Sequence, residues 1–182
     1  MKLKRESKGR RKVIDMKIVC EDKYLPSYAN DTDACMDLKV KIVNSDLRYK
    51  YFDRFDDGEF LEPCFDLRNS SWILPGETRV FDTGVKVSIP EDYVMLVFVR
   101  SSTGIKKGLV LANGTGVIDS GYKDEIKMAL YNIGNEPIQI KDGERLCQFM
   151  IIPRPKINLI RTEDNEEFRE GDRGGGIGST GR

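Results

Sequence analysis

Apolar residues occur along the chain in short groups that alternate with polar residues and end at turn residues. The segments predicted to be strands are residues 16–20, 37–43, 72–74, 78–89, 93–99, 109–112, 126–133, 138–140 and 145–152. Dipeptides typical of turns separate them: Leu25-Pro26, Pro75-Gly76, Ile89-Pro90, Asn113-Gly114, Gly134-Asn135 and Asp142-Gly143. No stretch shows the repeat of about 3.6 residues that a long amphipathic helix requires. The pattern predicts an all-β protein, a distorted antiparallel β-barrel or jelly roll.

Three segments depart from this pattern and divide the chain. Residues 1–15 hold seven Lys or Arg and few apolar side chains, so we expect a basic, disordered lead. Residues 16–160 form the predicted barrel domain, with an insertion at about 44–71 that carries five Asp, two Glu and a predicted turn at Asp57-Gly58. The insertion is interpreted as a decorated surface loop, with a protein-partner surface as the alternative. Residues 161–182 are charged and then glycine-rich, as in a flexible arm.

The composition narrows the function classes. The chain has 182 residues, and its 30 basic and 30 acidic residues give no net charge, which argues against direct nucleic-acid binding as its main activity. The four cysteines form no CxxC pair, and no signal or long apolar span precedes them, so we expect a reduced cytoplasmic protein without a membrane segment: Cys20, Cys35, Cys64 and Cys147. Because the chain has no histidine, a general base would be a carboxylate, lysine, tyrosine or cysteine.

The candidate chemistry is concentrated in residues 100–122, RSSTGIKKGLVLANGTGVIDSGY. We expect this stretch to be too short and too rich in glycine for a helix. Arg100 followed by Ser101 and Ser102 offers guanidinium donors and two hydroxyls to phosphate oxygens, and the glycines allow backbone amides to approach a ligand. Asp119 is the candidate base in this stretch.

Five segments in order resemble the motifs of the trimeric dUTP diphosphatase (dUTPase) family. They are DACMDL at 33–38, RSS at 100–102, ANGTGVIDSGY at 112–122, GERLCQ at 143–148 and RGGGIGSTG at 173–181. The resemblance runs from about Met16 to the C-terminus, without the 44–71 insertion. It implies a homotrimer that hydrolyses dUTP to dUMP and pyrophosphate with Mg²⁺, which keeps uracil out of DNA and supplies dUMP for thymidylate synthesis.

The resemblance also implies roles for residues. Asp119 matches the catalytic aspartate that accepts a proton from the attacking water, and Tyr122 matches the tyrosine that lies against deoxyribose. Asp37 matches the aspartate that orients waters on a Mg²⁺ held mainly by the triphosphate. The remaining substrate-binding positions are Arg100, Ser101, Ser102 and Gln148 at the phosphates, Asn113, Gly116 and Ile118 in a uracil-reading hairpin, and Arg173, Gly174, Ser179 and Thr180 in the arm. Arg145 is either an ion-pair partner or a ligand contact.

Two departures from the family pattern stand out. Cys35 occupies a position where the family usually has glycine, and the fifth motif is one residue short, with Ile177 where a phenylalanine commonly stacks on uracil. This shortened form resembles that of some bacterial and phage members. No other aromatic is assigned to the stacking position.

Three other functions are alternatives to dUTP hydrolysis. A dCTP deaminase, or a bifunctional deaminase and diphosphatase, has the same fold but uses a glutamate in the third motif, so Asp119 and Tyr122 favour the diphosphatase. A regulator would use a dUTP site to control a protein partner at residues 44–71. A structural β-domain that binds nucleic acid is disfavoured by the neutral charge.

Overall fold

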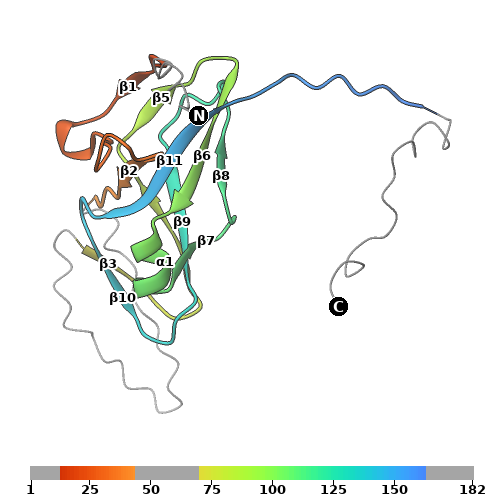
Figure 1. Ribbon diagram of the computed structural model, residues 1–182. Helices are drawn as coiled ribbons and strands as arrows, with labels where there is room; N and C mark the ends of the chain where they lie inside the picture. Colours follow the sequence, from red (N-terminus) through yellow and green to blue (C-terminus); the bar gives the residue numbers. More distant parts are fainter. Residues whose placement is uncertain (1–12, 44–69, 163–182) are drawn as a thin grey trace, which may run out of the picture.

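The computed structural model of the protein describes residues 13–43 and 70–162 (Figure 1). Apart from the short helices η1 (Asp22–Tyr24) and α1 (Ser101–Lys107), its regular elements are strands. They are β1 (Lys17–Val19), β2 (Met36–Lys39), β3 (Ser70–Ile73), β4 (Thr78–Asp82), β5 (Lys86–Ser88), β6 (Tyr93–Val99), β7 (Leu109–Leu111), β8 (Gly116–Ile118), β9 (Lys127–Asn132), β10 (Ile138–Lys141) and β11 (Arg145–Pro153). The predicted all-β class is therefore confirmed.

The strand pairings within the described residues are all antiparallel. They join the strands in the orders β1-β5, β10-β3, β2-β11-β6-β8 and β4-β9-β7. The two longest strands, β6 and β11, lie side by side in the largest sheet (Figure 1). Neighbouring strands in these sheets are mostly far apart in the sequence, as in a jelly roll or a Greek-key barrel.

One hydrophobic core fills the space between the sheets. Strand β9 shows the pattern most clearly, since Met128, Leu130 and Asn132 are fully buried while the residues between them reach the other face. Full burial of a side chain such as Leu130 contributes about 1.5–3 kcal/mol to folding. The buried amide of Asn132 donates to the carbonyl oxygens of Ile73 and Glu136, at 3.0 and 2.8 Å, so it is paired within the core.

The expectation that residues 100–122 contain no helix was wrong, because α1 occupies the start of this stretch. Arg100 precedes the helix with extended backbone, and Gly108 ends it in the left-handed conformation at φ 65°. The Gly108 N–H donates to the carbonyls of Gly104 and Thr103. An isolated helix of seven residues is unstable, so its ends and the burial of Thr103 stabilise it. No helix in the described ranges is long and apolar enough to cross a membrane.

Two predicted strands are shorter than expected. The strand predicted at 37–43 ends at Lys39, after which Lys41 forms only an isolated bridge with Asp82. The strand predicted at 78–89 is divided into β4 and β5 around Gly84, whose φ of 69° interrupts an extended backbone.

Several predicted segments fall outside the described residues. These are residues 1–12 of the basic lead, residues 44–69 of the insertion with its Asp57-Gly58 turn, and residues 163–182 of the arm. Strand β3 begins at Ser70, so the last two residues of the predicted insertion belong to a sheet.

Residues 154–162 continue from β11 and lead away from the rest of the described structure (Figure 1). They have no helix or strand, and each of them is exposed. Three large apolar side chains in this segment are largely accessible: Ile157 at 77%, Leu159 at 91% and Ile160 at 84%. Such a segment presents an unusual amount of apolar surface to solvent.

Candidate active site

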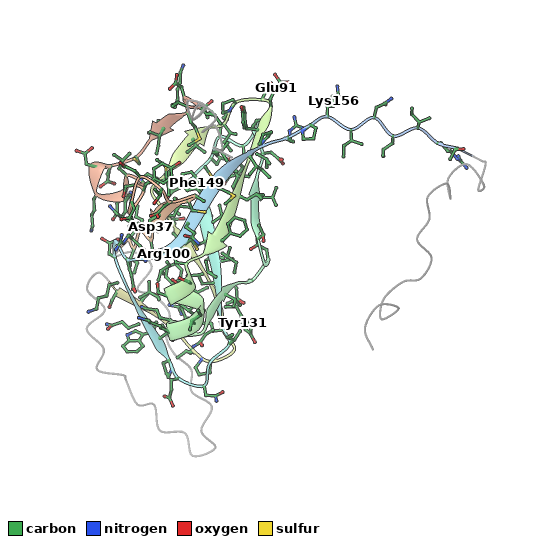
Figure 2. All side chains as sticks on the ribbon, in the orientation of Figure 1. Asp37, Glu91, Arg100, Tyr131, Phe149 and Lys156 are labelled. Carbon is green, nitrogen blue, oxygen red and sulfur yellow. The ribbon has the colours of Figure 1, made fainter. Side chains whose placement is uncertain are left out.

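Asp37 on β2 lies between two arginines. Its Oδ1 is 2.8 Å from Nε of Arg100, and its Oδ2 accepts a hydrogen bond from Nη1 of Arg145 at 3.0 Å. Figure 2 shows Asp37 and Arg100 next to each other where β2 approaches the start of α1. The Asp37 side chain is only 8% exposed, whereas the guanidinium-bearing side chains are 26% and 48% exposed. The carboxylate is thus buried, and the two cations reach toward solvent.

Strand register brings this group together. In β11, Gln148 pairs with Asp37 on one side and with Phe98 on the other. The Arg100 N–H donates to the carbonyl of Leu146 at 3.0 Å, which fixes the end of β6 against β11. The first, second and fourth sequence motifs therefore meet within one protomer, although more than 60 residues separate the first from the second.

Two hydroxyls lie beside the arginines in the first turn of α1. Ser101 is exposed and Ser102 is half-buried, and both directly follow Arg100. The N–H groups in the first turn of a helix have no partner within the helix. This corner of the molecule therefore presents guanidinium, hydroxyl and amide donors, which suit phosphate oxygens.

The predicted uracil-reading segment contains a turn, but its flanking strands do not form the expected hairpin. Gly114 has a φ of 72°, and its N–H donates to the Leu111 carbonyl at 2.9 Å, so the turn is present. In the described structure, however, β7 pairs with β9 and β8 pairs with β6, so the turn at Asn113 carries the chain from one sheet to another.

Strand β8 packs closely on β6 at its glycine. A Cβ added to Gly116 would lie 3.1 Å from Cβ of Val97, so a side chain there would crowd Val97 and require a small local shift. Ile118, at the other end of β8, packs against the hydrophobic core, while Asn113 in the preceding turn is exposed.

Asp119 and Tyr122 lie in the loop between β8 and β9. The Tyr122 N–H donates to the Asp119 carbonyl at 3.0 Å, which closes a tight turn. The Tyr122 hydroxyl donates to the Glu125 carbonyl at 2.7 Å, so the ring is held against its own loop while 37% of the residue stays exposed. Asp119 is exposed. Its side chain is therefore open to a ligand or a water molecule.

Within one protomer, Asp119 does not approach the arginines. The register of β6 and β8 pairs Met95 with Ile118, and Arg100 follows Met95 by five residues. Five strand residues span about 16 Å, and Asp119 continues β8 in the direction away from Arg100. A single protomer therefore holds two groups of predicted site residues that are separated along the sheet.

The pKa shifts in the described residues limit the choice of general base. Burial raises the pKa of the Cys147 thiol, beside Gln148, to about 12, so the thiol stays protonated at neutral pH. Hydrogen bonds to carboxylates raise the pKa values of Lys23, Lys41 and Lys127, which therefore stay cationic. None of these shifts produces a base at neutral pH.

Cys35, which stands where a glycine was expected in the first motif, is half-buried. Its pKa is raised by burial and then by the nearby carboxylates of Asp33 and Asp37. The described residues contain no group of three or more Cys, Asp or Glu that could hold a metal ion.

Arg173, Gly174, Ser179 and Thr180, which were predicted to bind the phosphates, lie outside the described residues, as does Ile177. Glu125 was missed by the sequence reasoning, because a glutamate three residues after Tyr122 forms no motif that the residues alone reveal.

The fold and these groups define a class, an antiparallel β-barrel protein that presents cationic and hydroxyl donors suited to phosphate. Comparison with known families then identifies the particular one. The dUTPase family model matches residues 64–181. The chain belongs to the dUTPase family.

Known proteins agree with this assignment. The deoxyuridine 5'-triphosphate nucleotidohydrolase of Escherichia phage T5 is 45% identical over 120 residues, which cover 65% of this chain and 77% of the phage protein. The protein of the same name from Clostridium tetani is 31% identical over 173 residues, covering 93% of this chain and 97% of its own. Among solved structures, a mutant dUTPase from phage phi11 of S. aureus, described with a structural Mg(II) ion, has a TM-score of 0.63 at 22% identity and covers 84% of this chain and 99% of its own. The structural likeness supports the jelly-roll fold.

Proposed function

We propose that the protein hydrolyses dUTP to dUMP and pyrophosphate by attack of water on the α-phosphorus, within the cytoplasm. The observation that carries the proposal is the Asp37, Arg100 and Arg145 group, in a chain of the dUTPase family. A triphosphate with several negative charges needs fixed cationic donors, and positioning supplies much of the catalysis in phosphoryl transfer.

The phosphates bind at the end of β6. Arg100 keeps guanidinium N–H groups beyond the one that faces Asp37, and the exposed Ser101 and half-buried Ser102 add hydroxyl donors. Gln148 contributes an amide from the neighbouring strand β11. Arg145 serves mainly to hold Asp37, since its Nη1 is committed to that carboxylate.

The uracil is read by the turn and strand around Asn113, Gly116 and Ile118. Their backbone donors and acceptors can pair with the edge of uracil, whereas cytosine presents the opposite pattern and would leave buried groups unpaired. Thymine differs from uracil only by a methyl group, so it must be excluded by steric closure around the base, since a mere difference in cavity size discriminates weakly.

Asp119 acts as the general base. Its exposed carboxylate accepts a proton from the attacking water while the new oxygen bond forms at the α-phosphorus, and pyrophosphate leaves with the electrons of the broken bond. The ring of Tyr122, held by its hydroxyl bond, lies against the deoxyribose and leaves no space for a 2′-hydroxyl.

The residues fit a divalent cation that is bound through water. Each carboxylate oxygen of Asp37 already accepts one arginine donor, and each retains a lone pair for a water on the metal. Mg²⁺, when bound to the triphosphate, would neutralise phosphate charge.

The active enzyme is a homotrimer in which each site combines residues of several copies. The separation of more than about 16 Å between the Arg100 and Asp119 ends of the β6 and β8 pair supports this arrangement, because one copy does not bring both to the same phosphorus. The exposed apolar side chains of Ile157, Leu159 and Ile160 support it too, since a neighbouring copy would cover them. The arm from a third copy then brings Arg173, Gly174, Ser179 and Thr180 to the phosphates.

Pyrophosphate release from dUTP tests the activity. Wild type should release pyrophosphate from dUTP with Mg²⁺ and should act poorly on dTTP, dCTP and UTP, and Asp119→Asn should abolish turnover while the fold remains intact. Deaminated product from dCTP would instead assign the protein to the deaminases. Tight binding of dUTP without turnover would point to the regulator.

Complementation tests the shared site. Asp119→Asn and Arg100→Ala should each be inactive alone, and equal amounts refolded together should regain activity in about one quarter of the sites, since half of the copies supply each intact residue. If both residues came from one copy, no mixed assembly would contain an intact site and activity would stay absent. Light scattering on the wild type gives the number of copies independently.

A further inference from the structure

Resting on the proposed function, we propose that Glu125 is a positioning residue that sets the preference for deoxyribose over ribose. Its carboxylate attaches the loop that contains Tyr122 to Gly84, in the turn between β4 and β5. Glu125 lies in none of the predicted motifs, and its side chain is bonded to the Gly84 N–H.

Glu125 is bonded at both its backbone and its side chain. Its carbonyl accepts the Tyr122 hydroxyl at 2.7 Å, and its Oε1 accepts the N–H of Gly84 at 2.6 Å. One residue therefore connects the sugar-facing ring with a separate part of the barrel. A hydrogen bond to an ionised acceptor is stronger than one between neutral groups.

Gly84, whose N–H donates to the Glu125 carboxylate, is held in place by its surroundings. Gly84 has a φ of 69°, and a Cβ added there would lie 3.1 Å from Cδ2 of Tyr24 and from Cδ of Lys41, so the peptide is confined between packed groups. Next to it, the fully buried Thr83 donates its hydroxyl to the Ile126 carbonyl at 2.7 Å. A donor held in this way gives the Glu125 carboxylate a fixed point of attachment.

Other contacts hold the two ends of the loop but not the ring. The Ile126 N–H donates to Val85 at 2.9 Å, and the Lys123 ammonium donates to the Ser120 carbonyl at 2.7 Å and to the Ser88 hydroxyl at 3.2 Å. Without the Glu125 carboxylate, the loop therefore remains attached at these points, and the peptide that joins Glu125 to Ile126 keeps its bond to the Val85 carbonyl. The Tyr122 side of the loop loses its second attachment, the one to Gly84. The expected defect is in sugar recognition and not in folding.

The selectivity ratio measures this effect. We compare kcat/KM for dUTP with kcat/KM for UTP in wild type, Glu125→Ala and Glu125→Gln. Loss of one hydrogen bond to a charged group should lower the ratio about tenfold in Glu125→Ala, mainly through KM for dUTP, with kcat changed less. Glu125→Gln retains an acceptor oxygen and should recover most of the ratio.

Glu77→Ala is the matched control. The Glu77 carboxylate also accepts a backbone N–H, from Leu74 at 2.8 Å, and binds Arg79, but it lies in the turn between β3 and β4. The Glu77→Ala substitution should lower the free energy of unfolding while leaving the ratio of kcat/KM for dUTP to kcat/KM for UTP at the wild-type value. A fall in both variants would show a general effect of destabilisation and would overturn the inference.

Each outcome is decisive. A wild type that fails to release pyrophosphate from dUTP defeats the proposed function and the inference together. An active wild type with an unchanged ratio in Glu125→Ala defeats the inference alone. If circular dichroism shows that Glu125→Ala does not fold, Tyr122→Phe decides, because it keeps the ring and removes the hydroxyl that binds the Glu125 carbonyl. An unchanged ratio in that variant overturns the proposal.

Discussion

Replacing Asp37 by asparagine perturbs the arginine group while keeping the shape of the side chain. Asparagine can accept one hydrogen bond through its oxygen, but its NH₂ group would face the donors of the second arginine. Because the Asp37 side chain is 8% exposed, the lost charge leaves two guanidiniums beside a buried amide. Both stability and substrate binding should change.

The exposure of each arginine side chain sets how much its ion pair with Asp37 contributes to the free energy of unfolding. The pair with Arg100, which is 26% exposed, is a charge-assisted bond at 2.8 Å and is worth about 1.5–3 kcal/mol. The pair with Arg145, at 48% exposure, is screened by solvent and is worth about 0.2–1 kcal/mol. The free energy of unfolding should therefore fall by about 2–4 kcal/mol, which lowers the urea midpoint by about 1–2 M.

Urea unfolding and steady-state kinetics at saturating Mg²⁺ measure these effects. We expect KM for dUTP to rise about tenfold, because Arg100 loses the carboxylate that orients it toward the phosphates. Asp82→Asn is the matched control, since Asp82 pairs with Lys127 at the surface and its loss should cost no more than about 1 kcal/mol.

Two results would refute the reasoning. A midpoint and a KM within the error of wild type would show that the arginines need no carboxylate. A normal KM for dUTP at saturating Mg²⁺, combined with a higher Mg²⁺ concentration for half-maximal activity, would show that Asp37 acts on the metal-bound waters and not through the arginines.

Three further predictions concern stability and reactivity. Burial opposes ionisation of Asp142, but hydrogen bonds from Lys23, a backbone N–H and a tyrosine hydroxyl hold its pKa below the ordinary 3.8. Its stabilising contribution is therefore present above that value and is lost as the pH falls through the lowered pKa, so urea midpoints of wild type and Asp142→Asn should differ at neutral pH and converge in acid. Because burial raises the pKa of Cys147 to about 12, iodoacetamide should label it only after unfolding, as peptide mapping will show, and rapid labelling of Cys147 in the native protein would contradict this burial. Gly116→Ala should cost about 1–3 kcal/mol in urea unfolding, because the new methyl meets Val97 at 3.1 Å, and an unchanged midpoint would mean that β6 and β8 separate without cost.

The strand pattern could be predicted because each strand leaves a local signal. In β6 the prediction at 93–99 matches the observed bounds, since five of its seven residues are β-branched or aromatic and none is charged. Helix α1 could not be predicted in the same way. Its seven residues carry little helix propensity, and it forms because Thr103 is buried and Gly108 ends it in a left-handed conformation that many turns also use.

In the candidate site, too, some features could be predicted from the sequence and others could not. Arg100 and Asp119 were predicted as site residues from their residue types and from the resemblance of their motifs to the dUTPase family, and their roles stay predictions. Their separation along β6 and β8 was not visible, because register is a property of strand pairing and has no local signal in the sequence. The same is true of Glu125, whose partner Gly84 lies 41 residues away in the chain.

The sequence by itself determined the all-β class, the family and the residue types available for chemistry, because alternation, turn dipeptides and motif order are written along the chain. Only the tertiary structure decided which of those residues meet. It brought Asp37 between two arginines, and it separated Asp119 from them, because antiparallel pairing between distant segments sets these distances.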